Sequence, residues 1–122
     1  MPAETPSPEA IERAHQAALV VDAAAEELEV PATLILRQSH LNLRKHHPSL
    51  EFRDRHTEAR HITALLLRER DRFRDYEIGR LLNYAAPSVN RVLSLTRRAR
   101  ESSPEQAAVI GRVEERLTED AA

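Results

Sequence analysis

Residues 75–94 read DYEIGRLLNYAAPSVNRVLS and carry the clearest fold signal in the chain. A short amphipathic segment is followed by a tight turn and by a second segment with its own apolar stripe. Gly79 allows the second helix to approach the first closely, and Asn83 tolerates the left-handed conformation that the turn needs. Val89 and Val92 then supply the core between the two helices. The segment therefore predicts a helix-turn-helix, with an ordinary helical hairpin as the alternative.

The rest of the sequence predicts an all-α protein, with one domain over 8–120 after a flexible tail at 1–7. About six helices are expected, at 8–28, 32–38, 57–72, 75–82, 87–100 and from 104 onward, so that the helix-turn-helix occupies 75–100. Their expected N-terminal caps are Ser7, Thr57, Asp75 and Ser103. Residues 40–56 contain Pro48, show no clean period and are rich in bases, so a long basic connecting loop is expected there.

The composition of the 122 residues excludes several classes of function. Without cysteine there are no thiolate zinc sites, thiol nucleophiles or disulfides. The two glycines, Gly79 and Gly111, cannot form a phosphate-binding glycine loop. No apolar run approaches the roughly 20 residues of a membrane span, and the N-terminus lacks the features of a signal peptide. We therefore expect a cytoplasmic protein with no membrane partner, no cofactor and no small-molecule substrate.

The net charge of −2 conceals an uneven distribution of charge along the chain. Residues 1–40 hold seven acids and two bases, whereas residues 41–100 hold seven acids and fourteen bases, a net of +7. Residues 101–122 are acidic again, with six acids and two bases. Every base except Lys45 is an arginine, whose planar guanidinium suits phosphates and base edges. This distribution permits a nucleic-acid-binding face, and solvated helix faces paired with nearby acids are the alternative.

If the second helix of the motif enters the major groove of DNA, its outer face must contact the bases. The residues at the spacing of that face are Pro87, Arg91, Ser94 and Arg98. Ser88 and Asn90 lie near the start of the helix, where they can reach base edges or phosphates, while Arg97, Arg98 and Arg100 are better placed for the DNA backbone. The expected DNA-contacting residues are, in full, Tyr84, Pro87, Ser88, Asn90, Arg91, Ser94, Arg98, Arg60, Arg44 and Lys45.

Several segments of the chain follow the pattern of one known family. They are VVDAAAE at 20–26, ARHITALLLRE at 59–69, and EIGR at 77–80 followed by Val89 and Arg91. On these segments, residues 19–117 resemble the C-terminal DNA-binding domain of the bacterial replication initiator DnaA, which has a Trp-repressor-like helical fold. The resemblance implies binding of double-stranded DNA through the helix-turn-helix, and association with the nucleoid.

The chain also departs from that family in two places. Where the family carries an Arg-Asp-His-Thr-Thr run before the valine, this chain has YAAPS at 84–88, in a turn one residue shorter. The basic loop before the central helix is expanded to 40–56, and its Arg44, Lys45, Arg53 and Arg55 can follow a DNA backbone or enter a minor groove. The sequence has no counterpart of the initiator's ATPase module, and DnaA-like domains also occur in certain transposases. The resemblance therefore implies a replication-linked or regulatory DNA-binding protein without ATPase activity.

A hypothesis of a different class is a helical protein-interaction adaptor that keeps the fold but has lost DNA binding. The acidic ends of the chain could then dock a protein partner or a second copy in a homodimer. Enzymatic and metal-binding roles are not expected. No two of the histidines have the four-residue spacing of a helical metal site, and no carboxylate is expected in an apolar setting that would raise its pKa.

Overall fold

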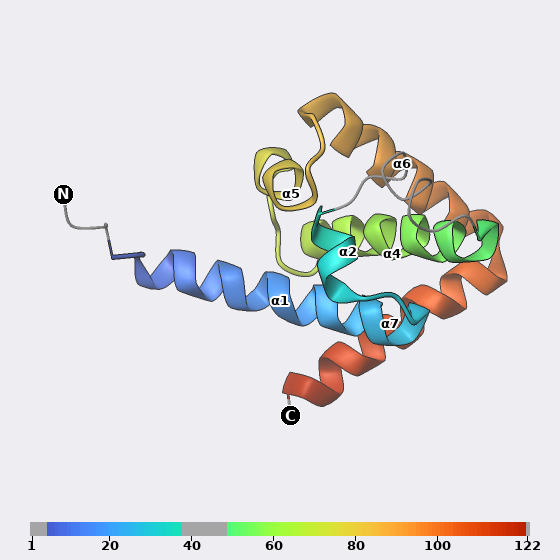
Figure 1. The fold of residues 1–122 in the computed structure, drawn as a ribbon, viewed down its shortest axis with the longest axis horizontal. Coiled ribbons are helices and arrows are strands. Elements are labelled where there is room, and N and C mark those ends of the chain that lie inside the picture. The colour runs from blue at the N-terminus through green and yellow to red at the C-terminus, as the bar shows by residue number, and fades with distance from the viewer. Residues whose placement is uncertain (1–4, 38–48, 122) are drawn as a thin grey trace.

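The computed structural model describes residues 5–37 and 49–121, and within these ranges all the regular structure is helical (Figure 1). The helices are α1 (Pro8–Leu28), α2 (Ala32–Arg37), α4 (Leu50–Glu69), α5 (Asp75–Leu82), α6 (Ala86–Ser102) and α7 (Pro104–Ala121). The prediction of an all-α protein with about six helices is therefore confirmed.

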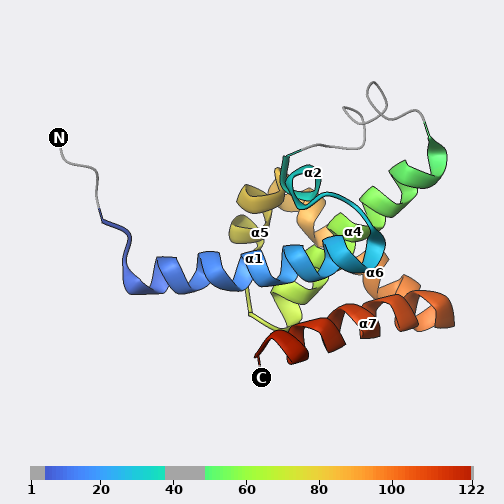
Figure 2. The same cartoon turned by 60° about the horizontal axis from the view of Figure 1, so that its bottom comes forward.

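Helix α4 forms the centre of the core. It contacts α1, α2, α5 and α6, while α7 packs against α1 and α6 (Figures 1 and 2). Fully buried aliphatic side chains, including Ile62 and Leu65 of α4, meet Val20 of α1 and Leu93 of α6 in one hydrophobic cluster. Burial of this apolar surface is the main force that holds the helices together. The N-terminal part of α1 extends beyond the other helices (Figure 2).

Two helix starts predicted from serine caps are confirmed. The Ser7 hydroxyl accepts a hydrogen bond from the Ala10 amide at 3.1 Å, and the Ser103 hydroxyl accepts one from the Gln106 amide at 3.2 Å. In each case the next residue is a proline, whose missing N–H is harmless in the first helical turn. Residues 1–4 of the expected N-terminal tail lie outside the described residues.

The predicted loop at 40–56 is wrong in its second half, because α4 begins at Leu50 and not at Thr57. The Ser49 hydroxyl caps this helix by accepting from the Phe52 amide. The apolar period is hidden in the sequence because a histidine occupies a core position. His56 is fully buried, and its Nε2 donates to the Leu34 carbonyl at 2.8 Å. Residues 40–48, with Arg44 and Lys45, lie outside the described residues.

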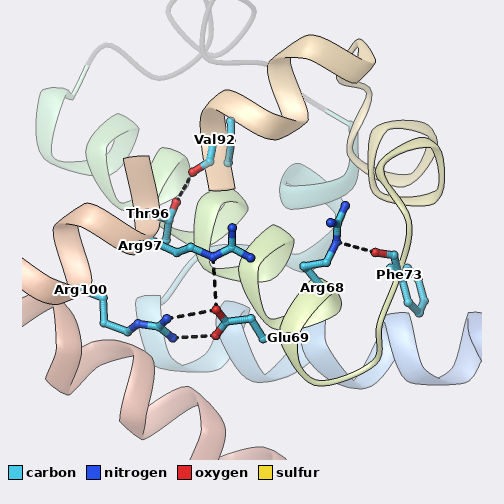
Figure 3. Close-up of polar contacts among 7 residues, drawn as sticks. All are labelled: Arg68, Glu69, Phe73, Val92, Thr96, Arg97 and Arg100. Atoms are coloured by element: carbon cyan, nitrogen blue, oxygen red, sulfur yellow. Dashed lines mark hydrogen bonds and ion pairs between the residues drawn. The ribbon is translucent and has the colours of Figure 1, made fainter. Parts of the chain in front are cut away.

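The connection between α4 and α5 also differs from the prediction. Helix α4 ends at Glu69, and Arg72 adopts a left-handed conformation with φ 56°. Asp75 is the first residue of α5 and not its cap. Its carboxylate forms an ion pair with Arg68, whose Nε also donates to the Phe73 carbonyl at 2.7 Å (Figure 3). These contacts of Arg68, with residues five and seven positions later, thus fix the start of α5.

Candidate nucleic-acid interface

The turn between α5 and α6 has the geometry that its glycine and asparagine predict. Asn83 is left-handed, with φ 61° and ψ 49°, and its N–H donates to the Gly79 carbonyl. The Tyr84 N–H donates to the same carbonyl at 2.8 Å. A Cβ built on Gly79 would lie 2.5 Å from the Tyr84 carbonyl oxygen and 3.4 Å from Val89 Cγ2. Any larger residue at position 79 would therefore push the turn away from α5.

Helix α6 has one buried face and one exposed face. The buried side chains are Val89, Val92, Leu93 and Thr96, and the Thr96 hydroxyl donates to the Val92 carbonyl at 2.7 Å (Figure 3). The residues of this helix that were expected to contact DNA are all exposed: Pro87, Ser88, Asn90, Arg91, Ser94 and Arg98. Ala85 precedes the helix and offers no side-chain cap, so small and exposed groups surround its N-terminus. The structure thus brings six of the expected residues together on one surface.

The three arginines near the end of α6 differ in their surroundings. Glu69 of α4 accepts two hydrogen bonds from Arg100, at 2.7 and 3.1 Å, and one from Arg97 at 3.4 Å (Figure 3). The Arg100 and Arg97 guanidinium groups hold the pKa of Glu69 below its usual value, and Glu69 raises the pKa of Arg100. No ion pair involving Arg98 is found among the described residues. Arg98 therefore remains available to an external anion, whereas Arg97 and Arg100 already have a carboxylate partner.

Arg60, expected to contact DNA, is instead a core residue. Only 3% of its surface is exposed. Its two Nη groups donate to the carbonyls of Ile35 and Leu82, and its Nε donates to the Tyr84 hydroxyl at 3.2 Å. The guanidinium also stacks on the Tyr84 ring, 4.6 Å from the ring centroid. Arg60 is therefore not part of the candidate interface. The half-buried Tyr84 contacts Arg60 and packs on the inner side of the turn.

Two exposed arginines of the motif are absent from the sequence prediction. Arg74 precedes α5 and Arg80 lies within it, and neither has an ion pair within the described part of the chain. In helix-turn-helix proteins the first helix crosses the DNA backbone, so both are candidates for phosphate contacts. The apolar positions Ile78 and Leu82 could have identified Arg80, because they face the opposite side of α5.

An open groove of about 540 Å³ between α4, α6 and α7 is lined by Glu58 and His61, and the pKa of each is shifted from its usual value. Burial raises the pKa of Glu58, although a hydrogen bond from Gln106 acts in the opposite direction. Burial and the nearby charge of Arg60 lower the pKa of His61. The expectation that no carboxylate has a raised pKa is thus wrong, since the contacts that bury Glu58 come from distant parts of the sequence.

The described residues contain no group of three or more side chains able to hold a metal ion. None of the described helices is long and apolar enough to cross a membrane. No family model, curated protein or solved structure matches the chain. Its function is therefore inferred from its own residues and their geometry.

Proposed function

We propose that this chain binds double-stranded DNA, with α6 as the helix that enters the major groove. One observation carries the proposal: α6 follows a tight turn on α5 and presents a continuous exposed face with two free guanidinium groups. Arg91 and Arg98 are exposed on that face and have no ion pair among the described residues. Such a helix fits the major groove, where arginine binds guanine or a phosphate.

The same surface suggests how bases are read. Arg91 and Asn90 lie in the first half of α6, where a recognition helix reaches base edges. Arginine pairs with guanine, asparagine pairs with adenine, and the exposed Ala86 and Pro87 suit thymine methyl groups. Arg98, together with Arg74 before α5 and Arg80 within it, would contact phosphates, which fix position without specifying sequence. We further propose that the chain is a Trp-repressor-like, DnaA-like domain with a replication-linked or regulatory role. It would act without ATPase activity and associate with the nucleoid in the cytoplasm.

The proposal is tested by fluorescence anisotropy with a labelled duplex of random sequence at several salt concentrations. Affinity should fall steeply with salt, because phosphate contacts release counterions. The double variant Arg91→Gln/Arg98→Gln should lose at least about tenfold in affinity, and its salt slope should fall by about 2. The control Ala18→Glu/Ala108→Glu changes the net charge by the same amount at exposed positions of α1 and α7. This control should bind much more tightly than the arginine variant.

Equal losses of DNA affinity in the two double variants would show that net charge, and not the exposed face of α6, governs binding. Circular dichroism should show the same helical signal for all three proteins, since every substituted side chain is exposed. Selection of binding sites from randomised duplexes then separates a sequence-specific role from a nonspecific one. An enriched site should contain guanine opposite Arg91.

A second candidate, the protein-interaction adaptor, is favoured by an open groove of about 690 Å³ between α1 and α5. Apolar groups such as Ala14, Leu36 and Phe73 line it. Ile11 of α1 and Tyr76 of α5 are each 58% exposed on these two helices. A protein partner or a second copy of the chain could cover this surface. Failure to bind random duplex even at low salt would favour the adaptor over the DNA-binding protein.

A further inference from the structure

Arg60 is buried beneath the turn of the helix-turn-helix, and no ion pair involving it is found among the described residues. Buried charges in proteins are usually paired with an opposite charge, because an isolated ion loses its hydration. The hydrogen-bond acceptors of Arg60 are instead two backbone carbonyls and one hydroxyl. An apolar residue would avoid this loss of hydration, so arginine at this position needs another explanation.

The two carbonyl acceptors of Arg60 share one structural property. Ile35 lies in the last turn of α2, and Leu82 is the last residue of α5. Carbonyls at helix C-termini lack partners within the helix and carry the negative end of the helix dipole. The guanidinium has five N–H donors in a rigid planar fork, so it can satisfy several such groups at once. A lysine ammonium is a single point and cannot reproduce this arrangement.

These contacts also bracket the left-handed residue of the turn. Arg60 bonds to the Leu82 carbonyl on one side of Asn83 and to the Tyr84 hydroxyl on the other. It also stacks on the Tyr84 ring. Helix α6 begins only two residues later, at Ala86. Movement of Tyr84 would therefore change the direction in which α6 leaves the turn.

We infer that Arg60 is the positioning residue of the recognition helix: by fixing Leu82 and Tyr84 it sets the orientation in which α6 meets DNA. This inference rests on the proposed DNA binding for its functional consequence. Its structural part does not, because the geometry of the turn can be measured without DNA. The hydrogen bond from the Tyr84 amide to the Gly79 carbonyl reports that geometry directly.

Three variants separate positioning from general stability. Arg60→Lys keeps the charge and loses the fork, while Tyr84→Phe keeps the ring and loses the hydroxyl. Leu117→Ala is the control, since it truncates a buried side chain of α7 away from the turn. Hydrogen exchange of the Tyr84 amide is compared at concentrations of urea that give all variants the same free energy of unfolding. Affinity for the duplex is measured under the same conditions.

We expect faster exchange of the Tyr84 amide, by tenfold or more, in Arg60→Lys and a smaller acceleration in Tyr84→Phe. The Leu117→Ala control should match the wild type. DNA affinity should fall in the same order, by about tenfold for Arg60→Lys. Unchanged exchange in both turn variants overturns the inference, and Tyr84→Phe provides this answer even if Arg60→Lys does not fold. A wild-type chain that does not bind DNA overturns the proposed function alone, since the exchange comparison still stands.

Discussion

Replacing Gly79 with alanine tests the contact on which the packing of α5 and α6 depends. The new Cβ would lie 2.5 Å from the carbonyl oxygen of Tyr84. Ordinary contact between non-bonded heavy atoms begins about 1 Å farther away, so the two atoms must separate. The obstructing oxygen belongs to the backbone of the turn and cannot rotate aside as the end of a side chain can. Relief therefore requires the turn, and α6 with it, to move.

Two terms of opposite sign determine the size of the effect. Alanine in a helix is favoured over glycine by about 1 kcal/mol. Overpacking of a well-filled contact costs about 1–3 kcal/mol, and the same movement strains the hydrogen bond from the Tyr84 amide to the Gly79 carbonyl. We expect a cost in the upper part of that range, which the gain in helix propensity reduces to a net loss of about 1–2 kcal/mol in the free energy of unfolding. This loss corresponds to a fall in Tm of about 3–10 °C for a domain of this size.

Gly111 provides a matched control on α7. No atom lies within 4 Å of a Cβ built at that position, so Gly111→Ala gains helix propensity without a clash. Its Tm should rise by a few degrees, because the gain is roughly 0.5–1 kcal/mol. Both variants are compared with the wild type by thermal melting followed with circular dichroism. If Gly79→Ala melts at or above the wild-type temperature, the close approach of α5 and α6 does not limit the residue at position 79, and steric crowding is not the reason for its glycine.

Three further substitutions test the charged groups. Glu27 of α1 has a pKa lowered by hydrogen bonds from two arginines of α7, so its stabilising effect is full above its ordinary pKa of about 4.5 and is lost as the pH falls. Glu27→Gln should therefore lower the urea midpoint at pH 7, and its difference from the wild type should shrink as the pH falls below 4.5. Glu58→Gln removes a carboxyl whose pKa is raised by burial, so it should not lower the midpoint at pH 7. Glu69→Gln releases two arginines of α6 and should increase affinity for random duplex several-fold at low salt, with a steeper salt slope; an unchanged slope would mean that these arginines lie away from the DNA.

Much of the helix pattern is local and can be predicted from the sequence. Serine caps, prolines in the first turn and the left-handed asparagine act within a few residues, and the structure confirms Ser7, Ser103 and Asn83 in these roles. The exposed face of α6 follows from its period, because its buried residues are aliphatic or threonine. These features depend on neighbouring residues alone, so no knowledge of the tertiary fold is needed to find them.

Three of the failures involve polar residues whose partners are distant in the sequence. His56 is part of the core and bonds to Leu34, 22 residues away, so its segment resembles a loop when only apolar residues are counted. Arg60 is expected at the surface because arginine is usually exposed, yet carbonyls from two other helices satisfy it. The partner of Arg100 lies 31 residues away on α4. Residue type predicts neither burial nor pairing in these cases.

The same pairings explain why a count of charges is a poor measure of affinity for DNA. Residues 41–100 carry a net +7, but their cations lie in different environments. Arg60 is buried, Glu69 neutralises part of the charge at the end of α6, and Arg68 is paired with Asp75. The cations of the motif that stay exposed without an ion pair among the described residues are Arg74, Arg80, Arg91 and Arg98. A phosphate contact contributes about 0.9 to the salt slope, so this surface supports a slope of about −4 at most. Affinity for nonspecific DNA should therefore be modest, and base contacts from Arg91 and Asn90 must supply any tight binding.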